Sequence, residues 1–215
     1  MKKISIVDYG LGNLFSVKQA LEFCSDDNKK HIFITSSPSE IQDSDYLILP
    51  GVGAFKNAMD AIKGRELDKE IKNFALSGKP LMGICLGMQI LATSSDEFGM
   101  HDGLNLIPGK VSYIGETNLN GSIRKVPSIG WKDLEVSLNS NKSSNLLTTH
   151  KNASVYFVHS YHFLPENEDH LIASYNYGDT AISAAVQKEN IIGFQFHPEK
   201  SSHHGLKILS SFLDM

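Results

Sequence analysis

Residues 79–91 constrain the fold of this chain more than any other stretch, because they predict a buried strand, a tight turn and a helix in immediate succession. Residues 81–84 form a short apolar run of the kind found in buried parallel strands, and residues 89–92 favour a helix. Between them, residues 83–87 have the pattern G-x-C-x-G. The two glycines permit a turn so sharp that the Cys85 side chain stands exposed at the carboxyl end of the strand.

Cys85 has two interpretations at this point. A thiol at a helix N-terminus is favoured as the thiolate, which is the nucleophilic form. An intracellular cysteine is, however, often a small buried core residue. A base, an orienting group and oxyanion donors elsewhere in the chain would decide for the nucleophile.

Composition and charge exclude several classes of function. The 215 residues carry a formal net charge of -4, so we expect no nucleic-acid partner, which would require a basic footprint. No apolar stretch reaches the length of a membrane span and no signal-peptide core follows Met1, so we expect a cytoplasmic protein without a membrane partner. Cys24 and Cys85 are the only cysteines, which argues against a disulfide scaffold.

The first half of the chain alternates between predicted strands and helices. The strands are expected at 3–8, 31–35, 46–49 and 81–84, and the helices at 14–23 and 66–76. This alternation implies parallel strands with right-handed crossovers, hence an α/β fold with an open doubly wound sheet and a flavodoxin-like core. Tyr9, Pro50 and Cys85 would gather at the carboxyl ends of the strands.

The second half of the chain predicts antiparallel additions to that sheet. Strand-like segments joined by short turns lie at 110–114, 126–136, 153–163, 171–177, 182–187 and 191–196. Residues 137–152 are polar and predict an exposed loop with one short helical turn, and residues 202–213 predict a closing helix. Because there is no internal repeat and no linker, we expect a single domain over residues 1–215.

A thiolate nucleophile needs a base, and the base needs a group that orients it. His197 is the best candidate for the base, because it follows the predicted strand 191–196 and Pro198 ends the pairing of that strand. Glu199 lies two residues further on and is placed to hold the imidazole tautomer. The alternative is a histidine at a helix start beside a solvated glutamate.

Backbone donors for a developing oxyanion are expected in two places. Gly51, Val52 and Gly53 follow the third predicted strand, and their glycines let backbone amides approach a ligand closely. The N–H of Leu86, directly after Cys85, is the second donor. An ordinary strand–helix loop is the alternative for residues 51–53.

We expect neither a cofactor nor a metal. A G-x-G turn follows the first strand, but Phe15 occupies the place of the third glycine of a dinucleotide-binding fingerprint. His159 and His162 are three residues apart on a predicted strand, which would put them on opposite faces. No group of histidines and carboxylates has the spacing of a zinc site.

Several motifs, taken together, resemble the class I (triad) glutamine amidotransferases. These are PGVGAF at 50–55, GICLGMQ at 83–89, VHSY at 158–161 and QFHPE at 195–199. Within that class the chain is most similar to the glutaminase subunits of imidazole glycerol phosphate synthase, through DYGLGN at 8–13, KVP at 125–127, GW at 130–131 and YFVHSY at 156–161. The resemblance covers nearly the whole chain, and several motifs in order are more specific than any one of them.

The resemblance implies a glutaminase that works through a glutamyl thioester. It assigns the attack on the glutamine side-chain amide to Cys85, proton transfer to His197 and orientation of that histidine to Glu199. The positions that match those holding glutamine in the family are the backbone around Gly53 together with Gln89, Glu97, Ser160 and Tyr161.

The resemblance also implies a protein partner. In the family, ammonia crosses to a (β/α)8-barrel synthase subunit of a heterodimer, which forms imidazole glycerol phosphate and AICAR in histidine biosynthesis. The partner would lie over the active-site face, with contacts at Tyr9, Asn13, Lys125, Trp131 and His159.

Ser128 departs from the family pattern, because the histidine-pathway subunits usually carry a histidine at this position, which faces the synthase. The ammonia acceptor therefore stays open between the histidine pathway and a paralogous synthase in surface-polysaccharide sugar amidination. A stand-alone cysteine hydrolase, such as a γ-glutamyl hydrolase, would need no partner surface. A binding protein without activity is the last alternative, and the intact set Cys85, His197 and Glu199 speaks against it.

Overall fold

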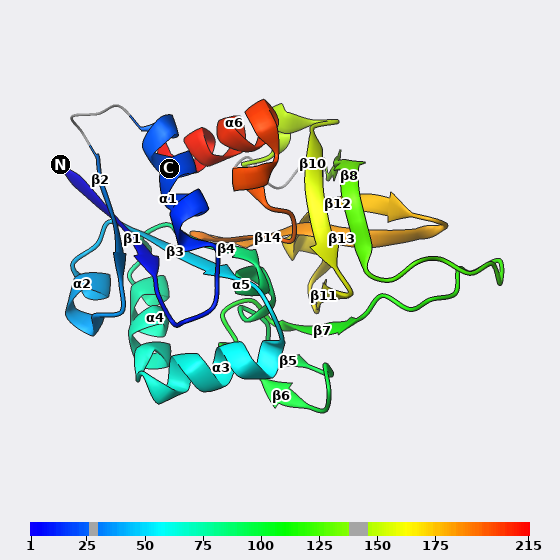
Figure 1. The fold of residues 1–215 in the computed structure, drawn as a ribbon, viewed down its shortest axis with the longest axis horizontal. Coiled ribbons are helices and arrows are strands. Elements are labelled where there is room, and N and C mark those ends of the chain that lie inside the picture. Colours follow the sequence, from blue (N-terminus) through cyan, green and yellow to red (C-terminus); the bar gives the residue numbers. More distant parts are fainter. Residues whose placement is uncertain (26–29, 138–145) are drawn as a thin grey trace.

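The computed structural model describes residues 1–25, 30–137 and 146–215. In this part of the chain, an eight-stranded sheet runs in the order β2-β1-β3-β4-β14-β13-β12-β9 (Figure 1). The parallel strands are β2 (Lys30–Thr35), β1 (Lys2–Val7), β3 (Tyr46–Gly51), β4 (Leu81–Cys85) and β14 (Ile191–Phe194). The antiparallel strands are β13 (Thr180–Lys188), β12 (Leu171–Tyr177) and β9 (Glu135–Val136). The predicted mostly parallel sheet with antiparallel additions is confirmed.

Helices cover both faces of this sheet (Figure 1). One face carries α1 (Leu14–Cys24) and α6 (Ser202–Leu213), and the other carries α2 (Pro38–Gln42), α3 (Phe55–Gly64) and α4 (Leu67–Leu76). Strand side chains alternate between the two cores, so Ile48 packs on the first side and Leu49 on the second. Burial on both faces is why these strands appear in the sequence as continuous apolar runs.

Helix α3 is absent from the predicted elements, because its N-terminus lacks a local capping signal. Ala54 occupies the N-cap position and makes no side-chain capping bond. The Phe55 N–H instead donates to Glu97 Oε2 at 2.6 Å, from a distant part of the chain. A carboxylate at a helix N-terminus is favourable, but only the tertiary fold brings this one there.

The helix expected through residue 92 is wrong in length. Helix α5 (Leu86–Gln89) ends after four residues. The following carbonyls bond outside the helix: Ile90 O accepts from Leu104 N at 2.8 Å and Ala92 O accepts from Asn105 N at 2.9 Å. Tertiary bonds thus replace the helical ones.

Two smaller sheets flank the main one. In the first, β10 (Ser154–His159) pairs antiparallel with β8 (Ser128–Asp133). The second contains β11 (Tyr161–Pro165), β7 (Gly109–Tyr113), β5 (Ser94–Ser95) and β6 (His101–Asp102). The predicted strand 153–163 is therefore broken at Ser160, and its halves belong to different sheets. His159 and His162 therefore lie on strands of different sheets, and both side chains are buried.

The remaining described segments are short. Of the predicted loop 137–152, residues 138–145 lie outside the described residues, and η1 (Thr148–His150) supplies one helical turn. The other short helices are η2 (Glu168–His170) and η3 (Pro198–Lys200). Among the described residues, none of the helices has the length and apolar character needed to cross a membrane. The C-terminal helix α6 has the bounds predicted for it.

Truncating a side chain of the central sheet should destabilise the fold strongly. Phe194 on β14 is 0% exposed and stacks on Phe196 with ring centroids 5.0 Å apart. Phe194→Ala is expected to reduce the free energy of unfolding by about 3–5 kcal/mol. Phe23→Ala, at a ring that is 78% exposed, should change it by less than about 0.5 kcal/mol. Urea unfolding measures both, and equal losses would contradict the assigned core.

Candidate active site

The site lies where three parallel strands end side by side. Strand β4 is paired with β3 and β14, with Cys85 opposite Gly51 and Ile84 opposite Phe194. This register puts the loop after β3 on one side of Cys85 and the segment after β14 on the other. The carboxyl edge of an open α/β sheet is the usual place for a ligand.

The turn at Cys85 is the sharp elbow that the sequence predicts, but the Cys85 side chain is buried on the pocket wall, which corrects its expected exposure. Cys85 has φ 56° and ψ -110°, a strained conformation for a residue with a side chain. A Cβ added at Gly83 would lie 2.5 Å from Gly87 O, and one added at Gly87 would lie 1.6 Å from Leu49 O. Both flanking positions therefore require glycine, because the backbone folds back on itself and on β3.

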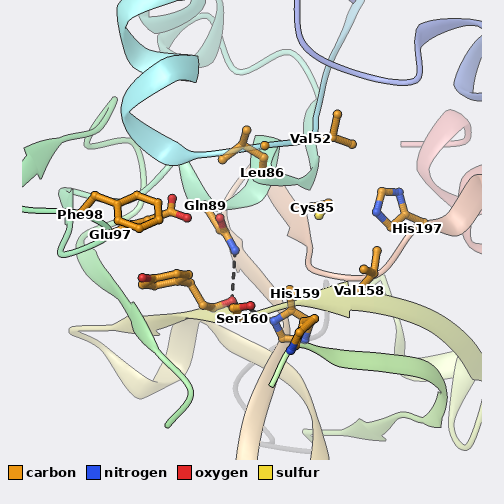
Figure 2. Close-up of a pocket in the computed structure, with 13 residues that line it drawn as sticks. Val52, Cys85, Leu86, Gln89, Glu97, Phe98, Val158, His159, Ser160 and His197 are labelled. Carbon is orange, nitrogen blue, oxygen red and sulfur yellow. Dashed lines mark hydrogen bonds between the residues drawn. The ribbon is translucent and has the colours of Figure 1, made fainter. Parts of the chain in front are cut away.

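His197 and Glu199 form a buried pair at the end of β14. His197 Nδ1 and Glu199 Oε1 are 2.8 Å apart, and the His197 N–H donates to Tyr156 O at 3.0 Å. Glu199 lies in η3, which begins at Pro198. His197 Nε2 has no hydrogen-bond partner within the described residues, and the ring lies beside Cys85 on the pocket wall (Figure 2).

The surroundings of His197 favour its charged form. Burial by itself lowers the pKa, but Cys85 and the Glu199 carboxylate outweigh it and raise the pKa of His197 to about 10. The opposite holds for His159, where burial lowers the pKa to about 4. The pocket thus combines a histidine that stays charged near neutral pH with one that stays neutral.

The pocket itself has a volume of about 380 Å³, within the range of small-molecule sites. Figure 2 shows Cys85 near its centre, with His197 on one side and Gln89 on the other, and Glu97 beyond Gln89. The opposite wall comes from the junction of β10 and β11. Phe98, Pro127 and Val158 also line the pocket, and none of them was among the predicted site residues.

The predicted oxyanion and substrate residues gather in this pocket. Val52, Gly53 and Leu86 line it together with Gln89, Glu97, Ser160 and Tyr161, while Gly51 ends β3 next to Cys85. Gln89 is held from within the protein: its Nε2 donates to Tyr161 O at 3.1 Å and to Gln195 Oε1 at 3.0 Å. The structure adds Gln195, whose Nε2 lies 3.7 Å from Cys85 Sγ. Its place within QFHPE was the only signal in the sequence.

The predicted partner contacts divide into two groups. Lys125 and Trp131 are exposed, the indole side chain by 51%, and Asn13 is half-buried. Tyr9 is 0% exposed and its hydroxyl donates to Pro50 O at 2.6 Å, and His159 is buried as well. Tyr9 is thus interior beside the loop after β3, and His159 lines the pocket, so neither side chain presents the exposed contact surface that was expected.

Ser128 is also interior, which corrects its expected position facing a partner. It pairs with His159 across β8 and β10, and its side chain is 0% exposed. Ser128 Oγ lies 3.0 Å from the Tyr175 hydroxyl oxygen, which lies 2.8 Å from His159 Nε2. The serine therefore completes a buried polar network.

A family model described as Glutamine amidotransferase class-I matches residues 6–215. The chain belongs to this family of enzymes. Its curated relatives include the imidazole glycerol phosphate synthase subunit HisH 1 of Legionella pneumophila (strain Paris), which is 43% identical over 218 residues and covers 100% of both chains. The subunit HisH of Bacillus subtilis (strain 168) is 42% identical over 212 residues, 99% of this chain and 96% of that relative. Both resemblances drawn from the motifs are confirmed.

Solved structures agree with the fold. The crystal structure of a glutamine amidotransferase has a TM-score of 0.70 at 19% identity, covering 98% of this chain and 97% of that chain. PurLQS from Thermotoga maritima has a TM-score of 0.69 at 20% identity, covering 99% of this chain and 98% of that chain. At such identities the likeness concerns the fold alone, and it confirms the α/β prediction.

The two histidines of the pocket should titrate in opposite directions. By NMR of the ring nitrogens, His197 is expected to stay protonated at pH 8, and His159 to stay neutral at pH 5. Because the pKa of His197 is raised on folding, the stability that it contributes is full below about pH 6.5 and is lost as the pH rises toward 10. Cys85→Ala and Glu199→Gln should each lower the pKa of His197. Titration of His197 near 6.5 in the unaltered chain would contradict the arrangement.

Proposed function

We propose that this chain is the glutaminase subunit of an imidazole glycerol phosphate synthase. It hydrolyses L-glutamine to glutamate and ammonia and delivers the ammonia to a (β/α)8-barrel synthase subunit of a heterodimer in histidine biosynthesis. The observation that carries the chemistry is one pocket in which Cys85 lies beside His197, whose other ring nitrogen bonds Glu199. The 41–43% identity with HisH subunits over 99–100% of the chain directs the proposal to this synthase.

The first half-reaction forms a thioester. Cys85 Sγ attacks the side-chain amide carbon of glutamine, and the carbonyl becomes an oxyanion. The Leu86 N–H and the amides of residues 51–53 stabilise that oxyanion. His197 donates a proton from Nε2 to the amide nitrogen, the C–N bond breaks and ammonia leaves.

The second half-reaction releases glutamate. His197, now neutral, takes a proton from a water molecule, and the resulting hydroxide attacks the thioester carbon. The C–S bond breaks, the sulfur leaves as a thiolate and His197 is again protonated. Glu199 holds Nδ1–H throughout, which fixes the tautomer and stabilises the imidazolium in both steps.

The far end of the pocket suits the amino-acid end of glutamine. Glu97 lies beyond Gln89 as seen from Cys85 (Figure 2), so its carboxylate is placed to bind the substrate ammonium. Residues 160–161 and Gln89 form the wall between the two ends. Gln89 acts mainly by shaping this wall, because its Nε2 is already shared between two internal acceptors.

The loop after β3 is suited to regulate hydrolysis. Gly53 has φ 104°, and a Cβ placed there would meet nothing within 4 Å. The backbone around Gly53 therefore has open space beside it, and Val52 is itself exposed. Binding of the synthase over this loop would set the orientation of the oxyanion donors.

The rim of the pocket suits a protein partner. Phe98 and Val52 line the pocket and are exposed, and Trp131 is exposed on β8. Aromatic side chains are enriched in interface cores. A stand-alone hydrolase would not need them. Ser128 is the departure from the family pattern that raises a polysaccharide synthase as partner, and its side chain is buried. The identity with HisH subunits supports the histidine-pathway synthase instead.

Replacing the nucleophile should separate the two activities of the complex. Cys85→Ala is expected to abolish glutamine hydrolysis, because no thioester forms, while the complex with the synthase still makes product from added ammonium. Product formation is measured with glutamine and with ammonium as alternative nitrogen sources. His197→Ala should reduce the glutaminase rate nearly as far. Loss of the ammonium-dependent reaction in Cys85→Ala would contradict the division of labour.

Truncating the exposed indole should weaken the complex. Trp131→Ala is expected to raise the Kd for the synthase subunit by about 30-fold, equivalent to about 2 kcal/mol, as for a central aromatic contact. Isothermal titration calorimetry measures the change. Phe23→Ala removes another exposed aromatic ring, near the end of α1, and should leave the Kd unchanged. Equal affinities of both variants would exclude Trp131 from the interface.

A further inference from the structure

We propose that Gln195 is a positioning residue for the nucleophile, donating a hydrogen bond from its side-chain amide to the sulfur of Cys85 and so favouring the thiolate. This inference rests on the role given to Cys85 in the proposed function. Gln195 is 0% exposed, and its Nε2 lies 3.7 Å from Cys85 Sγ. Sulfur accepts such bonds weakly as a thiol and more strongly as a thiolate.

The sheet fixes the backbone of Gln195 beside the elbow. Phe194 on β14 pairs with Ile84 on β4, so the next residues along the two strands are Gln195 and Cys85. On the other side, the Gln195 N–H donates to Ala184 O at 2.9 Å. The backbone from which the Gln195 side chain extends is therefore fixed by β4 on one side and by β13 on the other.

A backbone carbonyl fixes which end of the Gln195 amide faces the sulfur. Tyr161 O only accepts hydrogen bonds, so the group of Gln89 that faces it at 3.1 Å is the NH₂. The same Gln89 Nε2 lies 3.0 Å from Gln195 Oε1. With its oxygen directed to Gln89, Gln195 presents its NH₂ group to Cys85. The amide orientation follows from the network and not from an arbitrary choice.

The same carbonyl is held from its other side. His159 Nδ1 lies 2.8 Å from Tyr161 O, so Nδ1 carries the hydrogen. Because burial keeps His159 neutral, its Nε2 accepts from the Tyr175 hydroxyl at 2.8 Å, and Ser128 Oγ lies 3.0 Å from that oxygen. The polar chain is therefore continuous from β8 to the nucleophile, and each link restricts the next.

The Gln195 N–H can stabilise the sulfur throughout the reaction cycle, which His197 cannot. His197 gives its proton to the leaving ammonia, so its charge disappears during the first half-reaction. An amide N–H transfers no proton, so its hydrogen bond to the sulfur is still present when the thiolate leaves in the second half-reaction. Hydrogen bonding to the charged form favours that form. Gln195 therefore supports the thiolate at both ends of the cycle.

The titratable groups that face Cys85 are known, so an effect of Gln195 is separable from theirs. They are His197 after β14, Tyr9 after β1, and His159, Tyr161 and Glu97 across the pocket. Gln195 itself does not titrate. Its removal should move the pH dependence of the thiol without adding a new titration step.

The test is the alkylation rate of Cys85 by iodoacetamide as a function of pH. A Cys24→Ser background leaves Cys85 as the only reactive thiol, because these two are the only cysteines. In Gln195→Leu, the midpoint of the rate profile is expected to rise by about one pH unit, with alkylation about tenfold slower at pH 7. Gln187→Leu changes another buried glutamine of the same sheet and should keep the original profile.

Gln195→Glu is the second variant, and it tests the inference if Gln195→Leu does not fold. It keeps an acceptor for Gln89, removes the donor and adds a negative charge beside the sulfur, so the midpoint should rise further. In the synthase complex, both variants should lower the glutaminase kcat by about tenfold at pH 7 and change KM by less than about twofold.

A purely structural role for Gln195 would give a different result. Circular dichroism and the urea midpoint show whether each variant is folded. A folded variant whose alkylation profile matches that of the unaltered chain would overturn the inference. Alkylation needs no glutamine, so it reports on Gln195 even if the unaltered complex fails to hydrolyse glutamine. That second failure would overturn the proposed function alone.

Discussion

The pairing of β4 between β3 and β14 is the constraint on which the rest of this structure depends. One register, Gly51 opposite Cys85 and Phe194 opposite Ile84, places the loop after β3, the Cys85 thiol and the His197 imidazole at one edge of the sheet. A shift by one residue would reverse the facing of every side chain on the strand. The apolar layers on both faces, packed against α1 and α6 and against α3 and α4, hold that register.

The elbow shows how closely the backbone itself is packed. Gly87 leaves no room for a Cβ against Leu49 O, and Cys85 keeps an unfavourable φ. Strain of this kind costs on the order of 1–3 kcal/mol and persists only where the surroundings determine the conformation. Here the surroundings include the hydrogen-bonded amides of Gln89 and Gln195, so the polar network and the strained turn support one another.

The sequence predicted correctly those elements whose signals lie within a few neighbouring residues. The elbow, the parallel strands and α6 were recognised from apolar runs and glycines, and the motif order identified the family. Helix α3 was missed because its N-terminus is capped by Glu97 from another part of the chain. Tyr9, His159 and Ser128 were expected at the surface. Their burial could not be predicted, because it depends on tertiary contacts, namely the pairing of β8 with β10 and the hydroxyl bond to Pro50. The position of Gln195 beside the sulfur likewise depends on the register between two strands distant in sequence.

The order of the strands in the sheet also governs when the enzyme acquires its chemistry during synthesis. The elbow of β4 leaves the ribosome more than a hundred residues before His197, and β14 must insert between β4 and β13 to bring the histidine there. Until then β4 keeps an open edge, which is the part of a nascent chain most exposed to wrong pairing. The growing polypeptide therefore carries the Cys85 thiol without His197 beside it. Under the proposed mechanism, hydrolysis of glutamine begins only after residues 191–199 have been synthesised and docked.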